Sequence, residues 1–171
     1  MSAWSRGLSA KANAVSFLFL DVDGVLTDGL VTFTSEGHEI QSFHIHDGHG
    51  IKQLTRAGID VGILSGRRSP IVDRRAKELG LVEVHQGAED KLLVYEAFLA
   101  RHGLSDRQIA YMGDDVPDVP ILKRVGLALS VRNAHDAAKR SADYVTTRRG
   151  GEGAVREVCD LLLRARGIRL P

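Results

Sequence analysis

Two carboxylates follow directly on an apolar run near the N-terminus. In FLFLDVDGVLTDG (residues 17–29), large apolar residues precede Asp21, and Asp23 stands two positions later. A carboxylate can act as a nucleophile toward phosphorus, and an acid beside it can protonate the leaving oxygen and then activate a water. The pair therefore suggests hydrolysis of a phosphate ester, with Asp21 as the nucleophile and Asp23 as the acid–base group.

Further polar residues stand at the ends of other apolar segments. Ser65, Gly66 and Arg67 come after the run VGIL, Lys91 opens a helical pattern after GAED, and Asp114 follows IAYMG. Hydroxyl and ammonium groups can hold phosphate oxygens while charge develops on them. We expect Ser65 and Lys91 to have this role.

The acids together predict a metal site. Carboxylates that converge on one crevice repel one another, so a fold carries them only with a compensating cation. A few carboxylates, a carbonyl and waters are the ligands that suit Mg²⁺. We therefore expect Mg²⁺ to be held by Asp21, Asp114 and a backbone carbonyl, where it would neutralise charge on the transferred phosphoryl group.

Each of these residues also has a commoner structural role. A single aspartate after a strand is usually a turn or helix-cap residue, and a serine there is usually a capping hydroxyl. A lone lysine usually belongs to a solvated helix face. The chemical interpretation rests on finding all of them at strand ends and helix starts of one chain.

The elements that must position these residues are read from the hydrophobic pattern. Short apolar runs alternate with amphipathic stretches, which predicts an α/β fold with a doubly wound, mostly parallel sheet. In such a sheet ligands bind beyond the carboxyl ends of the strands, where the polar residues fall. Strands are expected at 16–20, 60–64, 82–85, 109–112, 127–130 and 144–145. Helices are expected near 51–57, 70–79, 91–102, 116–125, 134–140 and 155–166.

One segment departs from this alternation. Residues 30–45, LVTFTSEGHEIQSFHI, contain two β-rich runs around a Ser-Glu-Gly turn, which is a hairpin signal. The hairpin falls between the first strand and the first helix, where it could cover a ligand site. No repeat or linker divides the chain, so we expect one domain over residues 1–171, closed by a helix and tail at about 155–171.

The composition indicates an ordinary soluble globular protein. A hydrophobic content of 43% and a charged content of 26% are typical, and a net charge of +1 gives no sign of a nucleic-acid partner. The single cysteine cannot form an intrachain disulfide and fits a reducing compartment. No apolar run suits a membrane span or a signal peptide. We therefore expect a cytoplasmic protein without membrane or nucleic-acid partners.

The motifs together resemble those of a known family. DVDGVLTDG, LSGR, the lysine of EDK and GDDVPD, in this order, are similar to the four motifs of the haloacid dehalogenase superfamily phosphatases. The resemblance implies a phosphoric monoester hydrolase of Rossmann-like fold that uses Mg²⁺. It implies these roles: Asp21 as nucleophile and metal ligand, Asp23 as acid–base group and carbonyl ligand to the metal, Ser65 and Lys91 on phosphate, and Asp114 on the metal with Asp115 and Asp118 near it.

Within the superfamily, the chain is similar to the phosphatases of 3-deoxy-D-manno-octulosonate 8-phosphate, which serve lipopolysaccharide precursor synthesis. The resemblance rests on a hairpin flap in place of a cap domain, on FHIHDGHGIK and SGRRSPIVDRRAKELG, and on the tail GGEGAVREVCDLLL. It implies a phosphorylated sugar acid as substrate, with Arg67 and Arg75 facing it. It also implies a homotetramer whose neighbouring subunits help to close the site.

Several residues keep an alternative interpretation. Arg67 and Arg75 could instead form a solvated basic face. His46 stands where the group has a basic residue such as arginine, so it is a candidate for substrate binding or for a surface or interface position. The histidines at 38, 44, 46 and 49 lack the tight spacing and the cysteine partners of a zinc site.

Alternative functions also stay open. A phosphatase of a nine-carbon sialic-type sugar acid phosphate, or a broad-specificity sugar phosphatase, would carry the same catalytic groups. A phosphoacceptor signalling module also uses an aspartate, Mg²⁺ and a lysine on a doubly wound sheet, but Asp23 fits turnover better than storage of phosphate. A catalytically inactive binding module would not need the full set.

Overall fold

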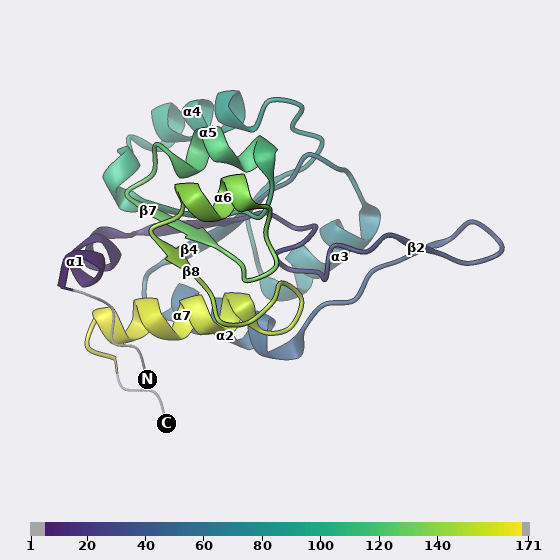
Figure 1. Ribbon diagram of the computed structural model, residues 1–171, viewed down its shortest axis with the longest axis horizontal. Coiled ribbons are helices and arrows are strands. Elements are labelled where there is room, and N and C mark those ends of the chain that lie inside the picture. The colour runs from purple at the N-terminus through teal and green to yellow at the C-terminus, as the bar shows by residue number, and fades with distance from the viewer. Residues whose placement is uncertain (1–5, 169–171) are drawn as a thin grey trace.

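A six-stranded parallel sheet forms the centre of the protein (Figure 1). The computed structural model describes residues 6–168. The strands lie in the order β5-β4-β1-β6-β7-β8, and every neighbouring pair is parallel. This confirms the predicted doubly wound α/β architecture. The strands are β1 (Phe17–Leu20), β4 (Asp60–Leu64), β5 (Glu83–His85), β6 (Ile109–Met112), β7 (Leu127–Ser130) and β8 (Tyr144–Val145).

The first strand occupies the middle of the sheet because both of its faces are apolar. Phe17 pairs with Asp60 of β4 on one side and with Ile109 of β6 on the other, and all four residues of β1 are buried. The chain builds the sheet outward from β1 through β4 to β5, then returns to add β6, β7 and β8 on the other side. The strand order reverses at β1, which is where open α/β sheets bind ligands.

Helices cover both faces of the sheet, as predicted. In Figure 1, α4, α5 and α6 lie above the sheet, and α2 and α7 lie side by side below it. The helices are α1 (Arg6–Ala14), α2 (Ile45–Arg56), α3 (Pro70–Leu79), α4 (Lys91–His102), α5 (Val119–Leu122), α6 (Asp136–Ser141) and α7 (Ala154–Ala165). Two short 3₁₀ turns, η1 (Asp106–Gln108) and η2 (Val116–Asp118), precede β6 and α5.

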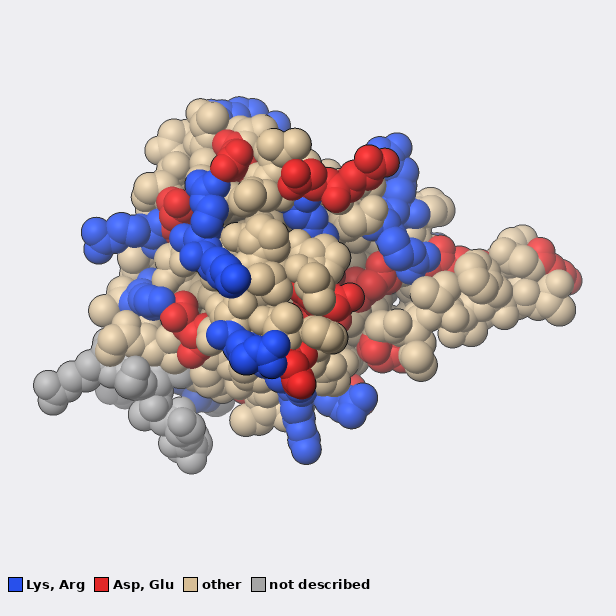
Figure 2. All heavy atoms as spheres, turned by 45° about the horizontal axis from the view of Figure 1, so that its top comes forward, with Lys and Arg blue, Asp and Glu red and all other residues tan. Residues whose placement is uncertain are grey.

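The predicted hairpin is present and projects away from the body (Figures 1 and 2). Its strands, β2 (Thr32–Phe33) and β3 (Glu39–Ile40), are antiparallel, and Gly37 takes a positive φ of 85° in the turn between them. Each strand has only two residues, so the hairpin is shorter than the predicted 30–45, and Ile45 already begins α2. Its apolar side chains face outward: Leu30, Val31, Phe33 and Ile40 are all exposed.

Three helices differ from the prediction. The helix predicted at 51–57 begins at Ile45, because the ring of His44 accepts the N–H of His46 and caps it. The helix predicted at 116–125 is divided into η2 and α5, which carry Pro117 and Pro120 in their first turns. Helix α1 was not predicted.

The buried apolar residues of the central sheet and of the helices that cover it form one continuous cluster. The free thiol of Cys159 belongs to that cluster. No helix within residues 6–168 is both long and apolar enough to cross a bilayer. The last three residues of the predicted tail lie outside the described part of the chain.

Candidate active site

A cavity of about 410 Å³ opens at the carboxyl ends of β1, β4 and β6. It brings together seven of the nine residues that the sequence singled out for the site. They are Asp21, Asp23, Ser65, Gly66, Arg67, Lys91 and Asp114. Among the residues that the structure describes, Arg75 and His46 do not line this cavity.

Asp21 is fixed by the end of the central strand. Its N–H donates to the carbonyl oxygen of Met112 over 3.0 Å, which continues the pairing of β1 with β6. The residue is 6% exposed, and its Oδ1 lies 2.8 Å from Nζ of Lys91. Burial raises the pKa of Asp21 to about 6, while Lys91 opposes that rise. The carboxylate is therefore poorly solvated, which favours its use as a nucleophile.

Lys91 is the first residue of α4, and Asp90 caps that helix by accepting the N–H groups of Leu92 and Leu93. The buried ammonium lies 2.8 Å from Asp21 and 2.7 Å from Asp118. Burial alone would lower the pKa of Lys91, but the two carboxylates more than offset it and the pKa is raised. The side chain therefore stays charged, and a charge there would reduce repulsion between Asp21 and an incoming phosphate.

Asp118 organises the site, a role that the sequence indicated only as proximity to the metal. Its Oδ1 accepts from Lys91 and, over 2.6 Å, from the hydroxyl of Tyr111. Its Oδ2 accepts the N–H groups of Asp114 at 2.9 Å and Asp115 at 3.1 Å. One buried carboxylate thus ties α4, β6 and the GDDVPD loop together. Burial raises the pKa of Tyr111 well above its ordinary value, so its hydroxyl remains a donor.

The acids fit a divalent cation. Carboxylate oxygens of Asp21, Asp114 and Asp118 lie within 4.8 Å of one another. Since Asp118 already has four donors, Asp21 and Asp114 are the residues available to an ion. The Oδ1 of Asp114 is buried without a hydrogen-bond partner. Burial first, and then repulsion from Asp21 and Asp118, raises the pKa of Asp114 to about 8. A hard cation such as Mg²⁺ would satisfy that oxygen and offset the repulsion.

The turn after Asp23 is shaped to receive Asp114. A Cβ at Gly24 would lie only 2.1 Å from Oδ2 of Asp114, so a side chain there would displace the carboxylate. Thr27 holds the turn, because its buried hydroxyl oxygen accepts the N–H groups of Gly24 and Gly29, each over 3.2 Å. This explains the glycines and the threonine of DVDGVLTDG, which sequence reasoning used only as a pattern.

Asp23 contacts both Arg67 and the hairpin. Its Oδ1 accepts from Nη1 of Arg67 over 3.1 Å and from Nε2 of Gln41 over 3.3 Å. Arg67 also binds Oε1 of Glu39 with Nη2, over 2.7 Å. Glu39 and Gln41 were not singled out from the sequence, because nothing in a short two-stranded hairpin indicates which loop its side chains will reach.

Ser65 directly follows β4 and lies beside the cavity. Its N–H donates to His85 over 2.8 Å and its carbonyl accepts from Ala88 over 3.1 Å, so the backbone is fixed on both sides. The residue is 2% exposed and lines the cavity together with Gly66 and Lys91. The arrangement suits a phosphate oxygen held between Ser65 and Lys91.

Arg75 and His46 lie elsewhere. Arg75 packs against α2, where a Cβ at Gly48 would lie 2.5 Å from its Nη2, and it pairs with Glu78 over 2.9 Å. Its guanidinium also lies over the ring of Phe43. His46 is on the exposed side of α2 and lines a different groove. Within residues 6–168, the only cluster of three or more metal-ligating side chains is the acidic one above, so the four histidines do not gather into a site.

Comparisons with known proteins identify relatives of this chain. The model of the haloacid dehalogenase-like hydrolases matches residues 78–158. The 3-deoxy-D-manno-octulosonate 8-phosphate phosphatase KdsC of Escherichia coli K12 is 42% identical over 163 residues, which cover 95% of this chain and 87% of that protein.

Solved structures of similar proteins superpose closely. The 3-deoxy-D-manno-octulosonate 8-phosphate phosphatase of Yersinia pestis is 41% identical with a TM-score of 0.93, covering 96% of this chain and 89% of that one. The enzyme of the same name from Moraxella catarrhalis, solved with magnesium, phosphate and KDO, is 41% identical with a TM-score of 0.92. That match covers 95% of this chain and 93% of the other.

Proposed function

The chain belongs to the haloacid dehalogenase-like hydrolases and is a phosphoric monoester hydrolase, and we propose that it hydrolyses 3-deoxy-D-manno-octulosonate 8-phosphate to the free sugar acid and phosphate. The names of its relatives support this substrate. The reaction would belong to lipopolysaccharide precursor synthesis in the cytoplasm.

One observation carries the mechanism: Asp21, Asp23 and Asp114 line one cavity, with Lys91 bound to Asp21. A carboxylate oxygen of Asp21 attacks phosphorus, and the bond between phosphorus and the sugar oxygen breaks, leaving an aspartyl phosphate. Asp23 gives its proton to the departing oxygen and then takes one from the water that cleaves the acyl phosphate. Asp21 is regenerated and phosphate leaves.

The remaining groups stabilise the phosphoryl oxygens. The hydroxyl of Ser65 and the ammonium of Lys91 hold two of the phosphoryl oxygens. The backbone N–H groups of the turn that follows Asp21 are further donors for these oxygens. Asp21, Asp114 and the carbonyl of Asp23 would hold Mg²⁺. When bound, Mg²⁺ supplies Lewis-acid stabilisation of charge on the transferred group.

Arg67 is our candidate for recognition of the substrate carboxylate, because its planar fork suits two carboxylate oxygens. In the free protein Nη2 of Arg67 binds Glu39, a carboxylate that the substrate would replace. Arg75 and His46 lie outside the cavity of their own chain, so we assign recognition to Arg67.

We further propose that the protein acts as a homo-oligomer, most simply the tetramer that the family resemblance implies. The hairpin projects from the body, and Leu30, Phe33 and Ile40 are 68%, 62% and 49% exposed. A covering neighbour would bury these side chains and shield the acyl phosphate from stray water. A fully active, monodisperse monomer in light scattering would contradict this.

The substrate is tested by phosphate release from a panel of sugar acid phosphates, with and without EDTA. We expect the eight-carbon 3-deoxy-D-manno-octulosonate 8-phosphate to give the highest kcat/KM, and EDTA to abolish turnover. A higher kcat/KM for a nine-carbon sialic-type sugar acid phosphate, or equal values across the panel, would overturn the substrate but keep the hydrolase. Slow single-turnover labelling without phosphate release would instead indicate a signalling module.

A further inference from the structure

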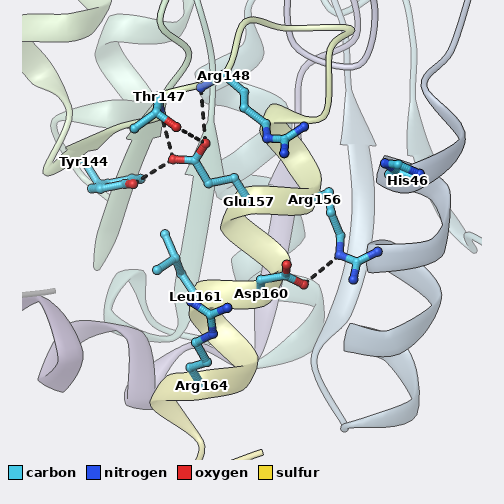
Figure 3. Close-up of a pocket in the computed structure, with 9 residues that line it drawn as sticks. All are labelled: His46, Tyr144, Thr147, Arg148, Arg156, Glu157, Asp160, Leu161 and Arg164. Atoms are coloured by element: carbon cyan, nitrogen blue, oxygen red, sulfur yellow. Dashed lines mark hydrogen bonds and ion pairs between the residues drawn. The ribbon is translucent and has the colours of Figure 1, made fainter. Parts of the chain in front are cut away.

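A second hollow lies away from the catalytic cavity. It is a groove of about 620 Å³ between α7, the segment 144–148 and the start of α2 (Figure 3). It shares no lining residue with the active-site cavity. The lining residues are His46, Tyr144, Thr147, Arg148, Arg156, Glu157, Asp160, Leu161 and Arg164.

Two glycines leave space for the side chains of two arginines of this groove. A Cβ at Gly153, where φ is +92°, would lie 3.1 Å from Nη1 of Arg148 and 3.4 Å from its Cδ. A Cβ at Gly50 of α2 would lie 2.9 Å from Cδ of Arg156. Each arginine therefore occupies space that the neighbouring glycine leaves open. In Figure 3 the two guanidinium groups and the ring of His46 lie around the same space between α7 and α2.

The carboxylates of the groove leave these guanidinium groups largely available. Glu157 accepts four hydrogen bonds, from the hydroxyls of Tyr144 and Thr147 and from the N–H groups of Thr147 and Arg148. Among the described residues, Asp160 accepts only from Nε of Arg156, over 2.7 Å, and neither terminal nitrogen of that arginine donates a hydrogen bond. Among residues 6–168, Arg148 has no side-chain ion pair.

One further acid lies near. Asp47 is 1% exposed and accepts the N–H of Arg156 over 2.7 Å, so it caps the start of α7 from α2. It does not line the groove. Arg156 keeps its ion pair with Asp160 through Nε, and the charge of Arg148 acts on Asp47, so acids of the chain offset part of this positive charge. The guanidinium of Arg148 and the terminal nitrogens of Arg156 still border the open groove without a hydrogen bond to any of residues 6–168. Arginine forks bind phosphate oxygens in pairs, and the volume of the groove is that of a metabolite site.

We propose that this groove binds a small phosphorylated metabolite, with Arg148 and Arg156 holding one phosphate group from two sides. Arg164 lines the same groove two helical turns after Arg156 on α7, where it would bind a second acidic group of the ligand. Tyr144 and Leu161 offer a less polar surface for the rest of the molecule. Nucleotides and sugar phosphates share this chemistry. The site is separate from the one that hydrolyses phosphate esters, so it does not depend on the proposed substrate.

The test is calorimetric titration of the full-length protein in EDTA with pyrophosphate, ADP and fructose 1,6-bisphosphate, which separates the two metabolite sources. Hydrogen exchange locates the bound ligand. We expect protection of residues 144–148 and 154–161, and a Kd at least about tenfold higher in the double variant Arg148→Gln, Arg156→Gln. The matched control is Arg149→Gln, an exposed neighbour outside the groove, whose Kd should stay within about twofold of wild type.

If the double variant does not fold, the single variant Arg148→Gln tests the proposal. It should fold, because residue 148 is exposed and its backbone N–H still donates to Glu157. It should raise the Kd at least about fivefold at an unchanged thermal midpoint. Protection confined to residues 21–29 and 113–118, or an affinity that the substitution leaves unchanged, would overturn the proposal. So would absence of binding by all three probes at millimolar concentration.

Discussion

Gln41 of the hairpin donates a hydrogen bond to Oδ1 of Asp23 over 3.3 Å, so the flap touches the proposed acid–base residue of its own chain. Arg67 donates to the same oxygen and also to Glu39 of the hairpin. The other amide atom of Gln41, its Oε1, is buried without a partner. The hairpin is therefore positioned to orient the carboxylate that we propose protonates the leaving group.

Replacing Gln41 should separate two kinds of substrate. In Gln41→Ala, the loss of orientation at Asp23 should lower kcat for an alkyl phosphate roughly three- to tenfold, because such a leaving group needs a proton. The kcat for p-nitrophenyl phosphate, whose leaving group needs little protonation, should change less than about twofold. Steady-state kinetics on both substrates measure this. Glu36→Gln, in the exposed hairpin turn, is the control; equal losses on both substrates would mean that Gln41 only supports the fold.

Replacing Asp21 should remove turnover without unfolding the protein. Asp21→Asn lacks the nucleophile, so release of phosphate should fall by more than about a thousandfold. Lys91 keeps its ion pair with Asp118, and the cost of burying a charged Asp21 disappears. The thermal midpoint should therefore stay close to that of wild type. Activity near wild type would exclude Asp21 as the nucleophile.

Replacing Arg67 should affect carboxylated substrates selectively. Arg67→Ala should lower kcat/KM for a sugar acid phosphate roughly 10- to 100-fold, because a charged, two-pronged contact is lost. The kcat/KM for p-nitrophenyl phosphate, which has no carboxylate, should fall less than about threefold. Arg68→Ala, the exposed neighbour, serves as the control. If both substrates lose activity equally, Arg67 does not bind the carboxylate.

Removal of the metal should be visible in stability as well as in activity. Mg²⁺ at about 100 times its Kd should raise the thermal midpoint by roughly 5–10 °C over protein in EDTA. Asp114→Asn should lose this shift, and without metal it should be at least as stable as wild type, because the buried carboxylate with a pKa of about 8 is costly at neutral pH. Asp136→Asn, on an exposed helix start, should keep the shift. A full Mg²⁺ shift in Asp114→Asn would place the metal elsewhere.

Acid should weaken the hydrogen bonds by which Glu157 ties α7 to residues 144–148. Burial raises the pKa of Glu157, but four hydrogen bonds more than offset it, so the pKa lies below its ordinary value of 4.5. The charged form is favoured in the folded state, so its stabilisation is present above pH 4.5 and is lost as the pH falls through the lowered pKa. Glu157→Gln should cost about 1 kcal/mol at pH 7 by urea denaturation. The difference from wild type should shrink below pH 4.5; a difference independent of pH would exclude the charge as its cause.

Part of the fold followed from local patterns. The strands at 60–64, 109–112, 127–130 and 144–145 and the helices at 70–79 and 91–102 agree with the prediction in both bounds. Apolar runs with glycine or a capping aspartate at their ends are local signals, and Gly80 and Gly103 do end their helices in the left-handed region. The start of α2 was not predictable in this way, because its first turns are polar and its cap is a histidine.

The sequence by itself determined that Asp21, Ser65 and Asp114 share one cavity. Residues that directly follow parallel strands must emerge at the same edge of the sheet, whatever the rest of the chain does. Their positions therefore depend only on where three buried strands end, and those ends are visible as the points where apolar runs stop.

Only the tertiary structure decided which other side chains meet them. Gly24 faces Asp114, and Gln41 reaches Asp23. Asp47 accepts the N–H of Arg156, in the first turn of a helix that begins at Ala154. Arg75 and Arg156 each pack on a glycine of α2 and do not enter the catalytic cavity. The direction of a helix or hairpin side chain depends on packing between segments far apart in the chain, and no local pattern encodes it.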